Sequence, residues 1–237
     1  MTERNRTDKL EAPSNAIGKI LSFIRERRYQ PSERLPSERD FAEKFDTSRG
    51  AVREALAALE TMRVIERRPN SGIYLRKIEE SSIDALVLYA ESGVPFEAKE
   101  IADVMEVRRM LEGQAVRLAC TRRTADNIRE ITAILEETNK RLSKKQSIER
   151  EDEAFHLAIF AATKNDILLR VARSFYELSR HRRKVYFADQ NRGRQSYEDH
   201  CTILEAIEER RGGRVPKNKD ALLPRKMEGE ELLASVT

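Results

Sequence analysis

The sequence has no tryptophan, and aromatic residues make up only 6% of its 237 residues. Charged residues, in contrast, account for 36% and hydrophobic residues for 39%. This composition argues against a β-sandwich and favours a helical, well-solvated protein. The length fits a small domain joined to a second domain of ordinary size.

Long apolar runs and cysteine clusters are also missing. No stretch approaches the roughly eighteen consecutive apolar residues of a membrane helix, and the first thirty residues lack an apolar signal core. We therefore expect a cytoplasmic protein without membrane insertion. The two cysteines, Cys120 and Cys201, have no metal-ligand spacing, and we expect both to stay reduced.

The excess of positive charge is small. The formal net charge is +4, and the basic excess lies in residues 1–80 and in the C-terminal tail. So small an excess is too weak to bind a polyanion by bulk attraction. Any affinity for nucleic acid is therefore expected to depend on locally clustered arginines.

Residues 35–75 carry the strongest local signal. Ser37 and Asp40 have the spacing of an N-terminal cap, which predicts a helix with Phe41 on its inner face. A second helix is predicted after Ser48, with Val52, Ala55, Leu56 and Leu59 facing the core.

Arg49 and Arg53 lie four residues apart on the other face of this second helix. Two outward guanidiniums on a short helix suit the major groove of DNA, where arginine pairs with guanine edges or phosphates. The β-rich runs 64–67 and 72–75 then predict a hairpin wing. The small residues at its tip allow the backbone to approach a sugar-phosphate strand or the minor groove.

In this order, the features resemble the DNA-binding domain of the GntR family of bacterial regulators. The matching motifs are Leu35-Pro36-Ser37-Glu38-Arg39, Ser48-Arg49, Val52-Arg53-Glu54-Ala55-Leu56, Leu59-Glu60 and Ser71-Gly72-Ile73-Tyr74. Ser32 and Arg63 depart from the pattern, since they stand near positions where the family commonly has glycine. The resemblance implies a winged helix-turn-helix, with DNA contacts expected from Arg39, Thr47, Ser48, Arg49, Arg53, Asn70, Ser71 and Gly72.

Beyond residue 97 the hydrophobic spacing is helical throughout, which predicts an all-α bundle. The predicted helices are 98–121, 125–143, 148–163, 167–187 and 194–210, with a break at 191–193. The fold class is thus mainly α, a winged helix-turn-helix followed by a helical bundle. The predicted organisation is a disordered N-terminus (1–12), a DNA-binding domain (13–77), a linker (78–96), a helical effector and dimerisation domain (97–210) and an atypical tail (211–237).

The helical region resembles the FCD effector domain of FadR-type GntR regulators over residues 98–209. The matching residues are Val107-Arg108, Leu111-Glu112, Ala115, Leu118-Ala119, Asp152, Phe155-His156, Asn165, His200, Ile203-Leu204 and Ala206-Ile207. The resemblance implies a homodimer that binds a small organic acid.

Asp152 and His156 lie four residues apart on a predicted helix, so both side chains point the same way and can share a divalent ion. An exposed or capping pair is the alternative interpretation. The resemblance adds His200 and implies a transition metal, zinc or nickel, which accepts mixed nitrogen and oxygen ligands. A further family histidine is missing, because no histidine follows His200.

The resemblance also implies that Arg108 holds an acidic effector, since a guanidinium facing a metal is a suitable clamp for a carboxylate. A surface salt bridge between Arg108 and Glu112 is the alternative. The basic run 180–184, which includes His181, is interpreted as a solvated face.

The tail departs from the family pattern, because its glycines and prolines exclude the single closing helix of FCD domains. These residues are Gly212, Gly213, Pro216 and Pro224. A frameshifted terminus and a genuinely divergent tail both remain open. We expect a loose tail, so that deleting residues 212–237 changes the melting temperature little.

Together, these features predict a homodimeric transcriptional regulator that binds an inverted repeat in double-stranded DNA. A repressor is favoured over an activator. Two alternatives remain. One is a constitutive DNA-binding regulator with a vestigial effector site. The other is a metal-dependent hydrolase that uses Asp152, His156 and His200, although it lacks a convincing general base and nucleophile.

Overall fold

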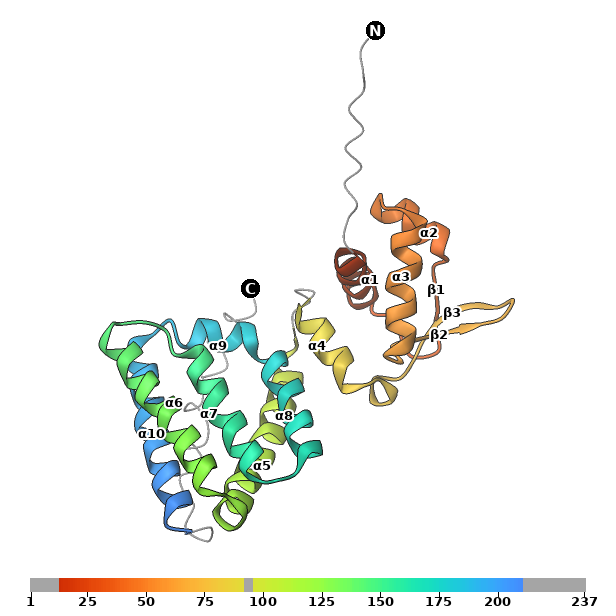
Figure 1. The fold of residues 1–237 in the computed structure, drawn as a ribbon. Coiled ribbons are helices and arrows are strands. Elements are labelled where there is room, and N and C mark those ends of the chain that lie inside the picture. Colours follow the sequence, from red (N-terminus) through yellow and green to blue (C-terminus); the bar gives the residue numbers. More distant parts are fainter. Residues whose placement is uncertain (1–12, 92–95, 211–237) are drawn as a thin grey trace. The chain divides into compact units, whose positions relative to one another are not determined.

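The structure is a computed structural model that describes residues 13–91 and 96–210 (Figure 1). The chain forms two units, one ending at Val94 and the other beginning at Pro95. The expectations for residues 1–12 and for the tail lie outside the described residues. Within the described ranges, no helix is both long and apolar enough to cross a membrane.

The first unit is a small helical domain with a three-stranded antiparallel sheet, in the order β1-β3-β2. The two-residue strand β1 was not predicted from the sequence, and it pairs with β3 through Arg34–Tyr74 and Leu35–Ile73. The elements are α1 (Pro13–Glu26), β1 (Arg34–Leu35), α2 (Glu38–Phe45), α3 (Arg49–Thr61), β2 (Ile65–Arg68), β3 (Gly72–Leu75), the 3-10 helix η1 (Ile78–Glu80) and α4 (Ile83–Glu91).

Side-chain caps fix the two central helices of this unit. Ser37 and Asp40 form a reciprocal capping box at the start of α2, and hydrogen bonds from Ser37 lower the pKa of Asp40. Ser48 accepts a hydrogen bond from the Ala51 amide at the start of α3. The predicted core positions are confirmed, because Phe41, Val52, Ala55, Leu56 and Leu59 are fully buried. Ile20, Leu21 and Ile65 complete this core.

Ser32 with φ 68° and Arg63 with φ 58° are among the residues of this unit in the left-handed backbone region. These are the positions near which the GntR pattern commonly has glycine. Glycine adopts such a conformation without the steric cost that a Cβ atom imposes. The segment predicted as a linker also packs onto this unit, because Ala85 of α4 is buried in the same core.

In the described residues, the second unit is a bundle of six helices, in which α7 packs against α5, α6 and α8 (Figure 1). Its apolar core includes Phe155 and Ile159 of α7 and Ile203 and Ile207 of α10. Thr124 forms a capping box at the start of α6. The helices are α5 (Ala98–Arg122), α6 (Ala125–Ser143), α7 (Glu149–Ala162), α8 (Asp166–Leu178), α9 (Arg180–Tyr186) and α10 (Gln190–Glu208).

Two sequence-based helix boundaries were wrong. The predicted helix 167–187 is divided at Ser179 into α8 and α9. The predicted break at 191–193 is instead the first turn of α10, which Asp189 caps. Gly193 lies in this turn. A Cβ atom there would be only 3.1 Å from Leu142 Cδ2, so close packing explains why the residue is glycine.

Replacement of Arg63 by glycine is expected to stabilise the first unit by about 0.5–1 kcal/mol. The left-handed conformation costs an L-residue roughly 1–2 kcal/mol, and the greater freedom of glycine in the unfolded chain offsets part of this gain. Calorimetric melting of the full chain measures the effect. Lys77→Gly is the matched control, because Lys77 is exposed with φ −67° and should lose stability. A lower melting temperature for Arg63→Gly would contradict the explanation.

Candidate functional site

The arginines predicted to contact DNA lie on the outer side of the helix-turn-helix. Arg49 and Arg53 are exposed on α3, whereas Val52 and Leu56 of the same helix are fully buried. Arg39 of α2 is also exposed, with its Nε atom 3.8 Å from the Asp40 carboxylate. Exposed guanidiniums on a helix anchored by its opposite face can approach a DNA groove without moving the core.

Arg53 is held in place by neighbours that the sequence did not reveal. Its Nε donates to Glu38 Oε2 at 3.2 Å, and its backbone carbonyl accepts a hydrogen bond from Arg67 Nη2 at 3.2 Å. The Arg67 guanidinium also lies 3.5 Å from Glu60 Oε2. Arg67 therefore ties the wing strand β2 to α3, a tertiary contact for which the sequence carries no local signal.

The tip of the wing is polar and exposed. Asn70 adopts a left-handed conformation with φ 57°, and Gly72 has φ 139°. The Ser71 and Tyr74 hydroxyls are 2.7 Å apart, and the Arg68 guanidinium lies over the Tyr74 ring, 4.1 Å from its centroid. Of the remaining predicted contact residues, Ser48 is exposed and Thr47 is half-buried.

In the second unit, the structure brings Asp152, His156 and His200 together, from α7 and α10. All three are buried, with at most 4% of each residue exposed. The two histidine Nε2 atoms are 3.2 Å apart, and Asp152 Oδ1 lies 3.8 Å from His156 Nε2 and 3.6 Å from His200 Nε2. One ligand atom from each residue lies within 4.8 Å of the others.

The chemistry of this donor set fits a divalent transition metal. Burial lowers the pKa of His200 to about 4 and that of His156 well below its usual value. Both rings are therefore neutral at pH 7, as metal ligation requires. Asp152 supplies an oxygen donor and accepts a hydrogen bond from Ser196 Oγ at 3.3 Å. Mixed nitrogen and oxygen ligands suit such ions.

Arg108 lies beside this cluster, and 2% of it is exposed. Its Nε donates to Glu112 Oε1 at 2.7 Å, and its Nη2 donates to Tyr176 Oη at 3.1 Å. The Tyr176 hydroxyl also donates to Glu112, whose Oε1 is 3.6 Å from His156 Nδ1. The pairing of Arg108 with Glu112 thus exists, but in the interior rather than on the helix surface.

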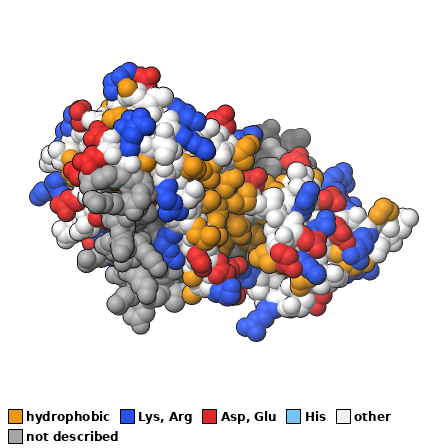
Figure 2. Space-filling view, turned by 90° about the horizontal axis from the view of Figure 1, so that it is seen from below, with side chains coloured by type: hydrophobic (Ala, Val, Ile, Leu, Met, Phe, Trp, Pro, Cys, Tyr) orange, Lys and Arg blue, Asp and Glu red, His pale blue; other side chains and the backbone are white. Residues whose placement is uncertain are grey.

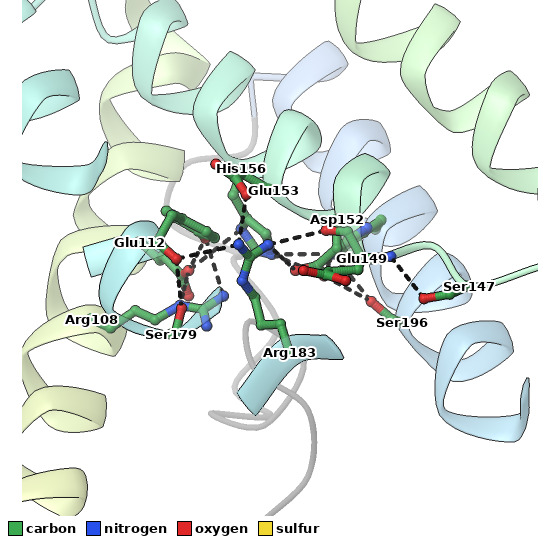
Figure 3. A network of polar contacts seen from close by, with 12 residues as sticks. Arg108, Glu112, Ser147, Glu149, Asp152, Glu153, His156, Ser179, Arg183 and Ser196 are labelled. Atoms are coloured by element: carbon green, nitrogen blue, oxygen red, sulfur yellow. Dashed lines mark hydrogen bonds and ion pairs between the residues drawn. The ribbon is translucent and has the colours of Figure 1, made fainter. Parts of the chain in front are cut away.

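The interpretation of residues 180–184 as a solvated face was wrong for Arg183. Its guanidinium lies in the middle of the buried network (Figure 3). It donates to the Glu149 carbonyl at 3.0 Å and to Glu153 Oε2 at 2.6 Å, and its Nη1 is 4.0 Å from Asp152 Oδ2. Ser179, Arg183 and Tyr186 are all buried, and their helical spacing is the sequence signal that could have placed Arg183 on the inner face of α9.

Comparisons with known proteins agree with this architecture. The model of the bacterial regulatory proteins of the gntR family matches residues 14–75, and the FCD domain matches residues 103–215. The chain is 30% identical over 190 residues to the HTH-type transcriptional regulator LutR of Bacillus subtilis, covering 78% of this chain and 85% of LutR. The chain belongs to the GntR family. Its FCD domain corresponds to the FadR subfamily, and it is a transcriptional regulator.

This GntR regulator is also similar to the Uxu operon regulator of Haemophilus influenzae, with 28% identity over 85% of this chain and 75% of the relative. Among solved structures, it resembles Lar, which controls the expression of the Listeria monocytogenes agr system. That alignment has a TM-score of 0.57 and 16% identity, and it covers 97% of this chain and 98% of the Lar chain. The structural likeness supports the fold.

Metal-free protein is expected to lose stability as the pH falls from about 6.5 to about 4. In this window the unfolded chain protonates His200, whereas the folded chain keeps it neutral. Below this window His200 is protonated in both the folded and the unfolded state, and above it His200 is neutral in both. Its contribution to stability is therefore constant outside the window. Unfolding midpoints measured between pH 4 and pH 7.5 test the expectation.

Other groups also titrate at acidic pH, so the comparison is made between variants. His200→Asn should flatten the slope in this window. His181→Asn should leave it unchanged, because His181 is exposed on α9. Identical slopes in the two variants would refute the assignment.

Proposed function

We propose that this regulator is a homodimeric repressor whose winged helices each bind one half of an inverted-repeat operator. The helical unit holds a zinc or nickel ion and a small organic acid, and occupation of that site weakens operator binding. The observation that carries this proposal is the buried convergence of Asp152, His156 and His200 with Arg108 beside them. Buried charges are costly unless opposite charges compensate them. An acidic ligand would supply negative charge to the metal ion and to Arg108, so the site suits such a ligand better than a purely structural role.

The DNA-binding part of the proposal is supported by the arrangement of α3 and the wing. Arg49 and Arg53 point away from the core, and Arg39 adds a third exposed guanidinium on the preceding helix. Arginine in this position contacts base edges or phosphates in the major groove. The exposed tip residues Asn70 and Ser71 are suited to contact the sugar-phosphate backbone.

Exposed apolar side chains on the helical unit support the homodimer, and Figure 2 shows hydrophobic side chains gathered on one face of the molecule. Met110 of α5 and Ile167 of α8 are each 65% exposed, and Val107 on α5 is 42% exposed. Helices α5 and α8 pack against each other. Large apolar side chains on neighbouring elements favour a protein interface, and symmetric dimers are the commonest assembly of soluble proteins.

The regulatory step is proposed to act through α7 and α9. Arg183 of α9 donates to Glu149 and Glu153 of α7 and lies near Asp152, which is also a metal-site residue. A ligand at Asp152 therefore changes the electrostatic surroundings of a contact between two helices. Such a ligand shifts the equilibrium between dimer geometries if it binds one of them more tightly.

A gel-shift experiment tests the proposed function directly. The full chain is incubated with DNA from upstream of its own gene, with and without zinc and a panel of organic acids. An acid that releases the protein from one specific fragment supports the repressor. Binding that no acid or metal alters would favour the constitutive regulator instead.

Arg49→Ala and Arg53→Ala are expected to weaken operator binding by about 1–3 kcal/mol if the side chain contacts a base. If it contacts a phosphate, the salt dependence of the logarithm of the binding constant should fall by about one unit. Arg129→Ala is the matched control, because Arg129 is an exposed arginine on α6. Unchanged affinity in both α3 variants, with an unchanged fold, would remove this assignment.

Protein purified without a histidine tag is expected to contain or take up about one zinc or nickel ion per chain. The ion should raise the melting temperature, since a ligand that binds only the folded state stabilises it. Asp152→Asn should remove most of this gain, and Asp166→Asn should not, because Asp166 is exposed at the start of α8. Failure to take up either metal would show that the site is vestigial.

A further inference from the structure

The buried network around the metal site contains balanced charges. Arg108 and Arg183 are each 2% exposed, as is Glu112, and Asp152 is 3% exposed. At the edge of the network, Arg182 is partly buried and adds a further positive charge. The four buried charges of Arg108, Arg183, Glu112 and Asp152 sum to zero.

A divalent ion at Asp152, His156 and His200 would leave this network with two uncompensated positive charges. Burial removes hydration from charged groups, so excess charge in the interior is strongly unfavourable unless an opposite charge accompanies it. A ligand that enters with the metal is therefore expected to bring two negative charges. A ligand with one carboxylate would compensate only half of the added charge.

Hydrogen-bond donors for such a ligand are already buried in this region. Arg108 Nη1, Arg182 Nη2 and Arg183 Nε have no hydrogen-bond partner among the described residues. Buried guanidinium groups normally satisfy their donors, so three unsatisfied ones near a single site indicate a missing acceptor. Guanidiniums bind carboxylates especially well, because their planar pairs of donors match the two carboxylate oxygens.

The three guanidiniums also affect one another. Burial, together with the charges of Arg108 and Arg183, lowers the pKa of Arg182 to about 10. Arg182 remains protonated at neutral pH, so an anion among these side chains would relieve their mutual repulsion. Figure 3 shows the Arg183 guanidinium between Glu112 on one side and Asp152 on the other. It thus lies between the Arg108 end of the network and the metal-site end.

We propose that the effector is a dicarboxylic acid. One carboxylate lies at the metal-site residues Asp152, His156 and His200, and the other is bound by Arg108, Arg182 and Arg183. This inference rests on the proposed metal and effector site, and it adds the charge of the ligand and a role for two arginines of α9. Glu112 Oε2 has no hydrogen-bond partner among the described residues, so it is available to accept a hydrogen bond from a hydroxyl group on the acid.

Calorimetric titration of the zinc-loaded full chain tests this inference. The ligands are dicarboxylates of increasing length, from malonate to adipate, each compared with its own monoamide. The monoamide has nearly the same shape and one negative charge fewer. At least one dicarboxylate is expected to bind about tenfold or more tightly than its monoamide. This preference should be lost in metal-free protein, because the four buried charges then already balance.

Arg182→Gln should lower the affinity for the preferred dicarboxylate by about tenfold and change the affinity for its monoamide much less. Arg180→Gln is the matched control, because Arg180 is an exposed arginine of the same helix. Arg182→Lys retains the charge and should bind more tightly than Arg182→Gln. The melting temperature of each ligand-free variant shows whether the bundle is intact.

The possible failures are distinguishable. Equal affinities for the dicarboxylate and its monoamide, or equal effects of Arg182→Gln and Arg180→Gln, would overturn the dicarboxylate inference and leave the effector site in place. If no acid binds the zinc-loaded protein, the proposed effector function fails, and the inference fails with it.

Discussion

The burial of paired charges between α5, α7 and α9 is the constraint on which the helical unit depends. Arg183 shows this most clearly, because its guanidinium is 2% exposed and is hydrogen-bonded to Glu149 and Glu153. Loss of one partner from such a set leaves an unpaired charge inside the protein, which typically costs about 3–5 kcal/mol. Mutual pairing therefore holds these helices in one arrangement, and that arrangement also determines which ligands fit.

The site and the apolar core of this unit are parts of the same packing. Phe155 of α7 is fully buried, and its ring stacks on His200 at a centroid distance of 3.9 Å. One face of α7 thus supplies Asp152 and His156 to the site while Phe155 and Ile159 fill the core. A substitution at the site consequently also disturbs packing, which is why charge-conserving and same-helix control variants are needed to separate binding from stability.

The sequence predicted most of the fold because its strongest signals are local. The caps at Ser37 and Ser48 and the apolar spacing of α3 depend on residues within a few positions of each other, and the structure confirms them. His200 could join Asp152 and His156 only through the family resemblance, since spacing cannot show that α7 and α10 meet. Arg183 was misassigned because a run of five basic residues looks solvated. Its burial depends on acceptors that lie thirty or more residues earlier in the chain.

The two units differ in what stabilises them, and this difference limits how regulation can work. The DNA-binding unit is held by caps, an apolar core and the contact of Arg67 with Arg53, none of which involves a residue of the metal site. These contacts orient α3 so that Arg49 and Arg53 are exposed. In the proposed mechanism, the ligand acts on charged contacts between helices of the other unit. We infer that it alters how two DNA-binding units are presented to an operator rather than the structure of the unit that contacts DNA, as expected when a ligand selects between dimer geometries.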